Sequence, residues 1–148
     1  LFLLLRAIIG FVPCGYLDGE VYKFGVVIYF MEKDCVFCKI ISGEVGSEKL
    51  FESENFIGIL DISPVSEGHT LIIPKEHYAT ILDMPDEFGT ELIGLVKKRG
   101  GEWVSQKEGN GFNFLQSNFK SAQQDVEHLH FHIVPRSKGD GIRYRYRD

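Results

Sequence analysis

Three histidines alternate with apolar residues near the end of the chain, at His128, His130 and His132. In an extended strand alternate side chains share a face, so the three imidazoles would project together, about 6.5 Å apart. The apolar residues between them would point into the core. A lone histidine on an apolar strand is usually a hydrogen-bonded core residue, but packing does not require three groups that titrate near a pH of about 6.5. The spacing therefore predicts a metal-binding face or a catalytic face.

A second group of candidate ligands is the pair Cys35 and Cys38, in a Cys-x-x-Cys arrangement. Such a pair is compatible with metal ligands, a redox dithiol or two buried thiols. No thioredoxin-like βαβ pattern surrounds it, which disfavours the redox interpretation. Two histidines would complete a tetrahedral Cys2His2 zinc site. The third cysteine, Cys14, has no assigned role.

The elements that must position these residues are short strands and one helix. Apolar runs bounded by turn residues predict strands at 49–52, 56–60, 70–73, 112–116 and 126–134. From Pro85 onward the spacing becomes helical, with Phe88, Leu92, Leu95, Val96 and Trp103 on one face. Gly100 and Gly101 lie where they can kink or end this helix, and residues 109–111 close it. One long helix against an antiparallel sheet of about five strands is an α+β fold.

Charge divides the chain near Met31. Residues 1–30 hold two basic and two acidic residues, which cancel, so the net charge of −5 belongs to residues 31–148. An acidic balance argues against a nucleic acid or an anionic membrane as the main partner. Three cysteines are too few for a disulfide scaffold. We therefore expect a cytoplasmic protein with neither a nucleic-acid nor a membrane partner.

The apolar segment 1–30 has three interpretations. It is an extension outside the functional domain, an extra strand or arm packed on the fold, or a targeting or membrane segment. No basic stretch precedes the opening leucines, and Arg6, Pro13 and Gly15 interrupt a run that needs about 20 apolar residues to span a bilayer. We favour the first interpretation, with the functional domain at 31–148.

The segment His128-Leu-His-Phe-His-Ile-Val134 resembles the signature of the histidine triad (HIT) superfamily. Four further segments resemble, in order, blocks of its Hint-like branch: Cys35-Val-Phe-Cys-Lys-Ile-Ile41, Asp61-Ile-Ser-Pro64, Gly68-His-Thr-Leu-Ile-Ile-Pro-Lys75 and Val134-Pro-Arg136. The similarity covers nearly all of residues 31–148. It implies the HIT-like α+β fold, a short N-terminal helix before the sheet, and a homodimer in which two sheets join.

The resemblance also implies a hydrolase or transferase that cleaves at the α-phosphate of a nucleotide conjugate, such as an adenosine phosphoramidate. His130 would be the nucleophile that forms a covalent nucleotidyl intermediate, and a nucleoside monophosphate would be released. His132 would donate a hydrogen bond to a non-bridging phosphate oxygen, and His128 would complete the triad. Two alternatives stay open: a dinucleoside polyphosphate hydrolase or phosphorylase, and a zinc-stabilised nucleotide-binding module with little catalysis.

Further residues are assigned by the same resemblance. Phe37 and Ile40 would sandwich the base, and Asp61 with Ile62 would hold the ribose, although Asp61 alone is equally well placed as a turn residue before Ser63 and Pro64. The other assignments are Asn118 and Gln124 near the ribose and phosphate, His69 as a supporting group, and Cys35, Cys38, His77 and His128 as structural zinc ligands.

This chain departs from the family pattern at Gln123-Gln124-Asp125-Val126, where Gly-Gln followed by Ser or Thr is common. In the family the missing hydroxyl is associated with the leaving group, and ionised Asp125 would repel a phosphate. Asp125 would help only as a protonated acid for an amine or phosphate leaving group, or by pointing away toward Arg136 or a positive group of the substrate. We expect retained nucleotide binding, an altered leaving-group preference and modest turnover. The alternating Arg and Tyr residues at 143–147 are either a solvated tail or an arm that reaches toward an active site.

Overall fold

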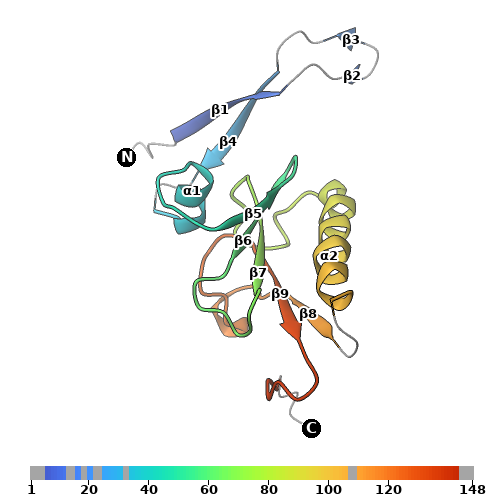
Figure 1. The fold of residues 1–148 in the computed structure, drawn as a ribbon. Coiled ribbons are helices and arrows are strands. Elements are labelled where there is room, and N and C mark those ends of the chain that lie inside the picture. Colours follow the sequence, from blue (N-terminus) through green and yellow to red (C-terminus); the bar gives the residue numbers. More distant parts are fainter. Residues whose placement is uncertain are drawn as a thin grey trace.

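The computed structural model describes residues 6–12, 16–17, 20–21, 25–31, 34–106 and 110–143, with side chains described from residue 34 onward. Five antiparallel strands form the main sheet in the order β5-β6-β7-β9-β8 (Figure 1). Their bounds are β5 Lys49–Glu52, β6 Phe56–Leu60, β7 Thr70–Pro74, β8 Gly111–Leu115 and β9 Phe131–Arg136. The helices are α1 Val36–Ile41 and α2 Gly89–Val104, with 3-10 turns η1 Asp86–Phe88 and η2 Lys120–Ala122. The predicted α+β fold with one long and one short N-terminal helix is confirmed.

The sheet has two apolar faces because successive side chains of a strand alternate between them. One face packs against Leu92 and Val96 of α2 and contains Phe56, Ile72, Leu129, Phe131 and Ile133. The other face packs against α1 and contains Ile57, Ile59, Leu71 and Ile73, together with Cys35, Phe37 and Cys38. His132 alternates with Phe131 and Ile133 along β9. The histidine therefore belongs to the α1 face, as the spacing predicts.

Strand β9 is shorter than predicted, and this is a correction to the range 126–134. It begins at Phe131, so His128 and His130 precede the strand. The reason lies in the hydrogen bonds of this segment. The Leu129 N–H donates to the Tyr78 carbonyl (2.6 Å) in place of a neighbouring strand. One imidazole nitrogen of His128 bonds to the Pro74 carbonyl, and one of His130 bonds to the His128 carbonyl. Leu129 stays fully buried, so the alternation survives without a regular strand.

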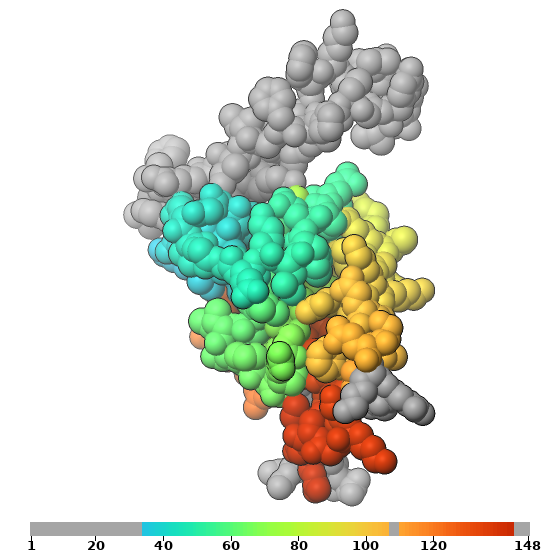
Figure 2. Space-filling model, in the orientation of Figure 1, coloured from blue at the N-terminus to red at the C-terminus, as the bar shows by residue number. Residues whose placement is uncertain are grey.

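Helix α2 continues through Gly100 and Gly101, which do not end it, and its last residue is Val104, ahead of the predicted close at 109–111. The α2 residues lie beside β5 in the space-filling view, yellow to orange against blue-green (Figure 2). A pocket of about 350 Å³ between them is lined by both elements, including Phe51, Leu95 and Arg99. Phe51 and Leu95 also pack on the α2-side core. This pocket is therefore on the face opposite the one that carries His132.

The strands that precede helix α1 form two separate sheets. β1 (Arg6–Val12) pairs with β4 (Gly25–Met31), and β2 (Tyr16–Leu17) pairs with β3 (Glu20–Val21). Neither pair joins the five-stranded sheet. Among the described residues, no helix has both the length and the apolarity needed to cross a bilayer. The domain boundary at residue 31 stays a prediction.

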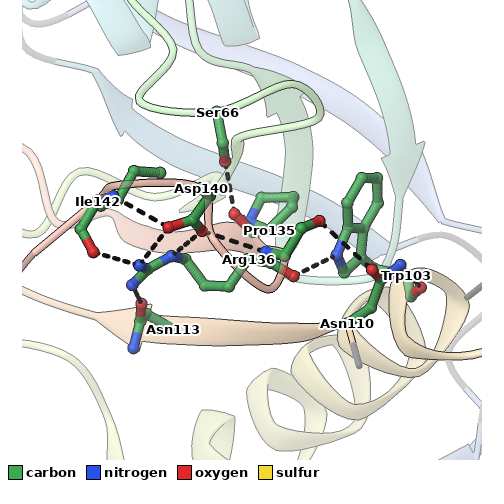
Figure 3. A network of polar contacts seen from close by, with 9 residues as sticks. Ser66, Trp103, Asn110, Asn113, Pro135, Arg136, Asp140 and Ile142 are labelled. Atoms are coloured by element: carbon green, nitrogen blue, oxygen red, sulfur yellow. Dashed lines mark hydrogen bonds and ion pairs between the residues drawn. The ribbon is translucent and has the colours of Figure 1, made fainter. Parts of the chain in front are cut away.

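A network of polar contacts holds the segment that follows β9 (Figure 3). The Arg136 guanidinium donates to both carboxylate oxygens of Asp140 (2.7 and 2.9 Å), to Asn113 Oδ1 and to the Ile142 carbonyl. Hydrogen bonding from Arg136 holds the pKa of the Asp140 carboxyl well below its usual range. Arg136 therefore fixes the turn that follows β9, and its ion pair is with Asp140. Residues 144–148 lie outside the described residues, so the arm hypothesis stays a prediction.

Two adjacent helix glycines provide a matched test of this packing. A Cβ on Gly100 would overlap the ring of Phe112, whereas one on Gly101 meets no atom within 4 Å. We expect Gly100→Ala to lower the free energy of unfolding by about 1 to 3 kcal/mol through overpacking. Gly101→Ala should raise it by up to about 1 kcal/mol because alanine restricts the unfolded chain. Urea denaturation of both variants checks this, and equal effects would contradict the packing of α2 on β8.

Candidate active site

Four side chains from three separate segments meet at the N-terminal end of α1. The ligand atoms of Cys35, Cys38, His77 and His128 all lie within 4.8 Å of one another. His128 Nδ1 is 3.4 Å from Cys35 Sγ and 3.6 Å from Cys38 Sγ, and His77 Nδ1 is 3.3 Å from Cys38 Sγ. Ordinary zinc bond lengths in a tetrahedral site set neighbouring sulfur and nitrogen atoms about 3.5 Å apart. The four residues predicted as ligands are thus brought together in a geometry that can bind a metal.

The chemistry of this cluster agrees with its geometry. The Nε2 atom of His128 lies 2.9 Å from the Pro74 carbonyl, which only accepts, so Nε2 carries the proton and Nδ1 turns a lone pair toward the sulfurs. A hydrogen bond from the Cys38 thiol is the largest cause that holds the pKa of the Cys35 thiol far below its ordinary value. A thiolate and a bare imidazole nitrogen are the forms that bind metal. His128 is fully buried, so a substrate cannot reach this ligand of the cluster from solvent.

The ring of His130, two residues after His128, is also oriented by a hydrogen bond to a backbone carbonyl. Its Nδ1 donates to the carbonyl of His128 at 2.7 Å, which leaves the Nε2 lone pair free. The ring of Phe37, from α1, contacts the His130 ring edge-on with centroids 5.2 Å apart. Burial lowers the pKa of His130 below its ordinary value. A neutral imidazole with one free nitrogen is the form needed for a nucleophile.

His132 receives its hydrogen bond through a second histidine, His69. The Val65 backbone N–H donates to His69 Nδ1 at 3.2 Å, so the proton of neutral His69 sits on Nε2. That atom is 2.9 Å from His132 Nδ1, which must accept. His132 therefore carries its own proton on Nε2. Burial, together with the nearby His130 and His69, lowers the pKa of His132 to about 4, so the ring is a neutral donor at neutral pH.

Asp61 lies at the end of β6, beside this pair of histidines. Its Oδ2 atom is 3.5 Å from His69 Nδ1 and 4.0 Å from His132 Nδ1. Its Oδ1 atom accepts the Ser63 N–H at 2.8 Å, which is the turn role that the sequence left open. Asp61, His69 and His132 also form a group of three possible metal ligands. A carboxylate thus borders the triad on the side of the β6–β7 loop.

The predicted polar residues of the loop that precedes β9 brace the protein. Gln124 is buried; its Oε1 accepts the Phe119 N–H at 2.7 Å, and its Nε2 donates to the carbonyls of Ala79 (2.7 Å) and Val126 (3.0 Å). Asn118 Oδ1 accepts the Ile81 N–H at 3.0 Å. Asp125 is exposed, and its charge acts on both His130 and His132 in the direction that raises their pKa. The loop therefore sits within electrostatic reach of the triad.

Two predicted base and ribose residues differ in their surroundings. Ile40 is partly buried and packs on the α1-side core with Phe37. Ile62 is 94% exposed and packs on neither core cluster of the described residues. The groups that sequence reasoning missed are in the backbone: the Pro74 and His128 carbonyls and the Val65 N–H. No residue type announces them, because any residue at those positions offers the same atoms.

Comparison with known proteins agrees with this site. The family model described as the HIT domain matches residues 42–139. The adenosine 5'-monophosphoramidase HNT1 of Candida albicans is 42% identical over 106 residues, 69% of this chain and 70% of that protein. The adenylylsulfatase HINT3 of Arabidopsis thaliana is 40% identical over 110 residues, 74% of this chain and 56% of that protein. The chain belongs to the HIT family.

A solved structure extends the comparison to the metal cluster. A zinc-bound histidine triad family protein from Mycobacterium smegmatis is 38% identical, with a TM-score of 0.68, over 76% of this chain and 81% of that chain. Zinc is thus bound by a protein of the same fold. The cluster of two cysteines and two histidines in the present chain can bind a metal ion.

Proposed function

We propose that this chain is a nucleotidyl hydrolase or transferase that cleaves nucleotide conjugates at the α-phosphate, of the adenosine phosphoramidate type, and releases a nucleoside monophosphate. The observation that carries the proposal is the state of His130. Its Nδ1 proton is engaged by the His128 carbonyl, its Nε2 is free, and burial keeps it neutral. The monophosphoramidase and adenylylsulfatase names of its relatives are in line with this chemistry.

In the first step, His130 Nε2 attacks the α-phosphorus, a nitrogen–phosphorus bond forms and the bond to the leaving group breaks. The imidazole gains positive charge as it does so. The hydrogen bond from Nδ1 to the His128 carbonyl strengthens when the ring becomes cationic, so this contact stabilises the transition state more than the ground state. Water then attacks phosphorus, the bond to His130 breaks, and the nucleoside monophosphate leaves.

His132 would stabilise the charge that develops on the non-bridging oxygens. Its Nε2–H is the only proton that the Val65–His69–His132 chain leaves for donation outward. A fixed donor aimed at a developing negative charge needs no reorganisation during the reaction. His69 then acts as a positioning residue, and Asp61 keeps a compensating negative charge beside both rings.

Nucleotide binding would use the α1 side of the triad. Phe37 presents its ring next to His130, and Ile40 extends the same apolar surface, which suits a flat base. Asp61 would accept from the ribose hydroxyls, with Ile62 alongside. Asn118 and Gln124 would act by holding the 116–125 loop in place, in addition to any direct contact with ribose or phosphate.

Asp125 is the residue that we expect to affect the choice of leaving group most. It is exposed beside the triad, so a phosphate leaving group meets an unfavourable charge there. A departing amine needs a proton at nitrogen, which solvent can supply, and an amine carries no negative charge for Asp125 to repel. This favours amine over polyphosphate leaving groups, although the same triad is chemically competent for dinucleoside polyphosphates.

The metal is proposed to be a structural zinc held by Cys35, Cys38, His77 and His128. Four protein ligands leave no open position, so the ion would fix α1 to the segment that enters the triad and take no part in the chemistry. We also propose that residues 31–148 form the functional domain. Its sheet would join a second copy through β8, because the other edge, β5, has a register shift and charged Lys49 and Glu52, which discourage edge pairing.

The nucleophile assignment is tested with an adenosine phosphoramidate as substrate. His130→Asn keeps a donor near the His128 carbonyl but removes the attacking nitrogen, so kcat should fall by at least about a thousandfold. Rapid quenching of the wild type should trap a nucleotidyl-protein adduct that the variant lacks. Turnover that survives the substitution would remove His130 from its role.

The zinc assignment is tested by metal analysis and thermal denaturation of protein made without added zinc. Wild type should carry about one zinc per chain. Cys38→Ser should lose it and melt at a lower temperature, because a ligand present at about 1,000 times its Kd contributes about 4 kcal/mol to folding. Cys14→Ser is the matched control, since Cys14 belongs to no proposed site. Wild type with far less than one equivalent would contradict the assignment.

A further inference from the structure

In the loop from Gln116 to Asp125, Phe119 adopts a backbone conformation that is unfavourable for any residue with a Cβ atom. Phe119 has φ 67° and ψ 161°, a region occupied almost only by glycine because a Cβ is strained there. Burial does not repay that strain, since the Phe119 side chain is 57% exposed. An observed outlier of this kind at the border of a site motivates a functional hypothesis.

The position of Phe119 is fixed from below. Its N–H is bound at 2.7 Å by the buried side chain of Gln124, whose amide also grips Ala79 and Val126. The neighbouring Asn118 holds the Ile81 N–H. The backbone that carries the exposed ring is therefore held in place, which lowers the conformational entropy that the loop would lose on binding a ligand.

This loop forms the second border of the triad. Phe37 from α1 lies against His128 and His130 on one border, with ring centroids 5.8 and 5.2 Å apart. The loop lies on another, because it directly follows Leu115, which pairs with His132 between β8 and β9. The charge of Asp125, at the far end of the loop, also acts on His130 and His132. In the proposed function the α1 border takes the base. The substituent on the other side of phosphorus, which is the leaving group, is then left to the loop.

We propose that Phe119 is a specificity-determining residue, whose ring stacks on a flat apolar leaving group so that arylalkylamine conjugates are preferred over alkylamine conjugates. This inference rests on the proposed function, because it assigns the leaving-group class of the same site. Stacked aromatic pairs gain attraction beyond the area that they bury. Leu82, 78% exposed on the loop that Asn118 contacts, makes a protein partner the competing occupant of this surface.

The test compares kcat/KM for three adenosine phosphoramidates: unsubstituted, n-butylamine-linked and phenethylamine-linked. Wild type is compared with Phe119→Gly, Phe119→Leu and the control Leu82→Ala. We expect Phe119→Gly to lower kcat/KM for the phenethylamine conjugate about tenfold, with the other two substrates unchanged, and to raise Tm because glycine relieves the strain. Phe119→Leu should lose the aryl preference while keeping an apolar side chain, and Leu82→Ala should keep it.

Binding is measured in parallel so that the outcome does not depend on turnover. In a His130→Asn background, titration with the phenethylamine and butylamine conjugates should give a Kd ratio that Phe119→Gly abolishes. Failure of wild type to cleave the unsubstituted phosphoramidate would reject the proposed function, while the Kd ratio would still decide this inference. Equal losses on all substrates, no loss on any, or a change of oligomeric state in Phe119→Gly at sedimentation equilibrium would overturn it.

Discussion

Each imidazole of the triad has one ring nitrogen bound, directly or through a second histidine, to a backbone group that can play only one hydrogen-bonding role. The Pro74 carbonyl holds His128, the His128 carbonyl holds His130, and the Val65 N–H reaches His132 through His69. A carbonyl cannot donate and an amide N–H cannot accept, so the tautomers are set by the fold. In the proposed function these three identical side chains have three different roles: ligand, nucleophile and donor.

This constraint explains the departure of the chain from a regular strand. A β9 continued back to residue 126 would place the His128 and His130 backbones in ladder pairing with β7. Instead Leu129 bonds to Tyr78 and still fills the α2-side core. The side chain of His128 can then reach Cys35 and Cys38, which ties α1 and the Phe37 ring to the triad. Within the described residues, no buried side-chain nitrogen or oxygen lacks a hydrogen-bond partner.

Much of the fold and of the candidate site can be predicted from periodicity and short motifs in the sequence. The alternation around His132 predicted its face, and helical spacing predicted that Leu92 and Val96 pack on the sheet. The resemblance named the four residues that meet in a cluster able to hold a metal ion. Strand ends were misjudged where side chains compete for backbone groups, as at His130. The strain at Phe119 could not be predicted, because a glycine-like backbone is invisible when the residue is phenylalanine. The roles of the Val65, Pro74 and His128 backbones depend on long-range contacts that no local pattern encodes.

The central claim is that the fold alone holds His130 as a neutral ring with its proton on Nδ1 and its lone pair on Nε2. Long-range proton–nitrogen correlation NMR of the imidazoles, on zinc-loaded protein at neutral pH without substrate, tests it directly. We expect a protonated Nδ1 and an unprotonated Nε2 for His130, with the opposite tautomer, protonated on Nε2, for His132. A His130 ring protonated on Nε2, or one that exchanges between tautomers, would contradict it.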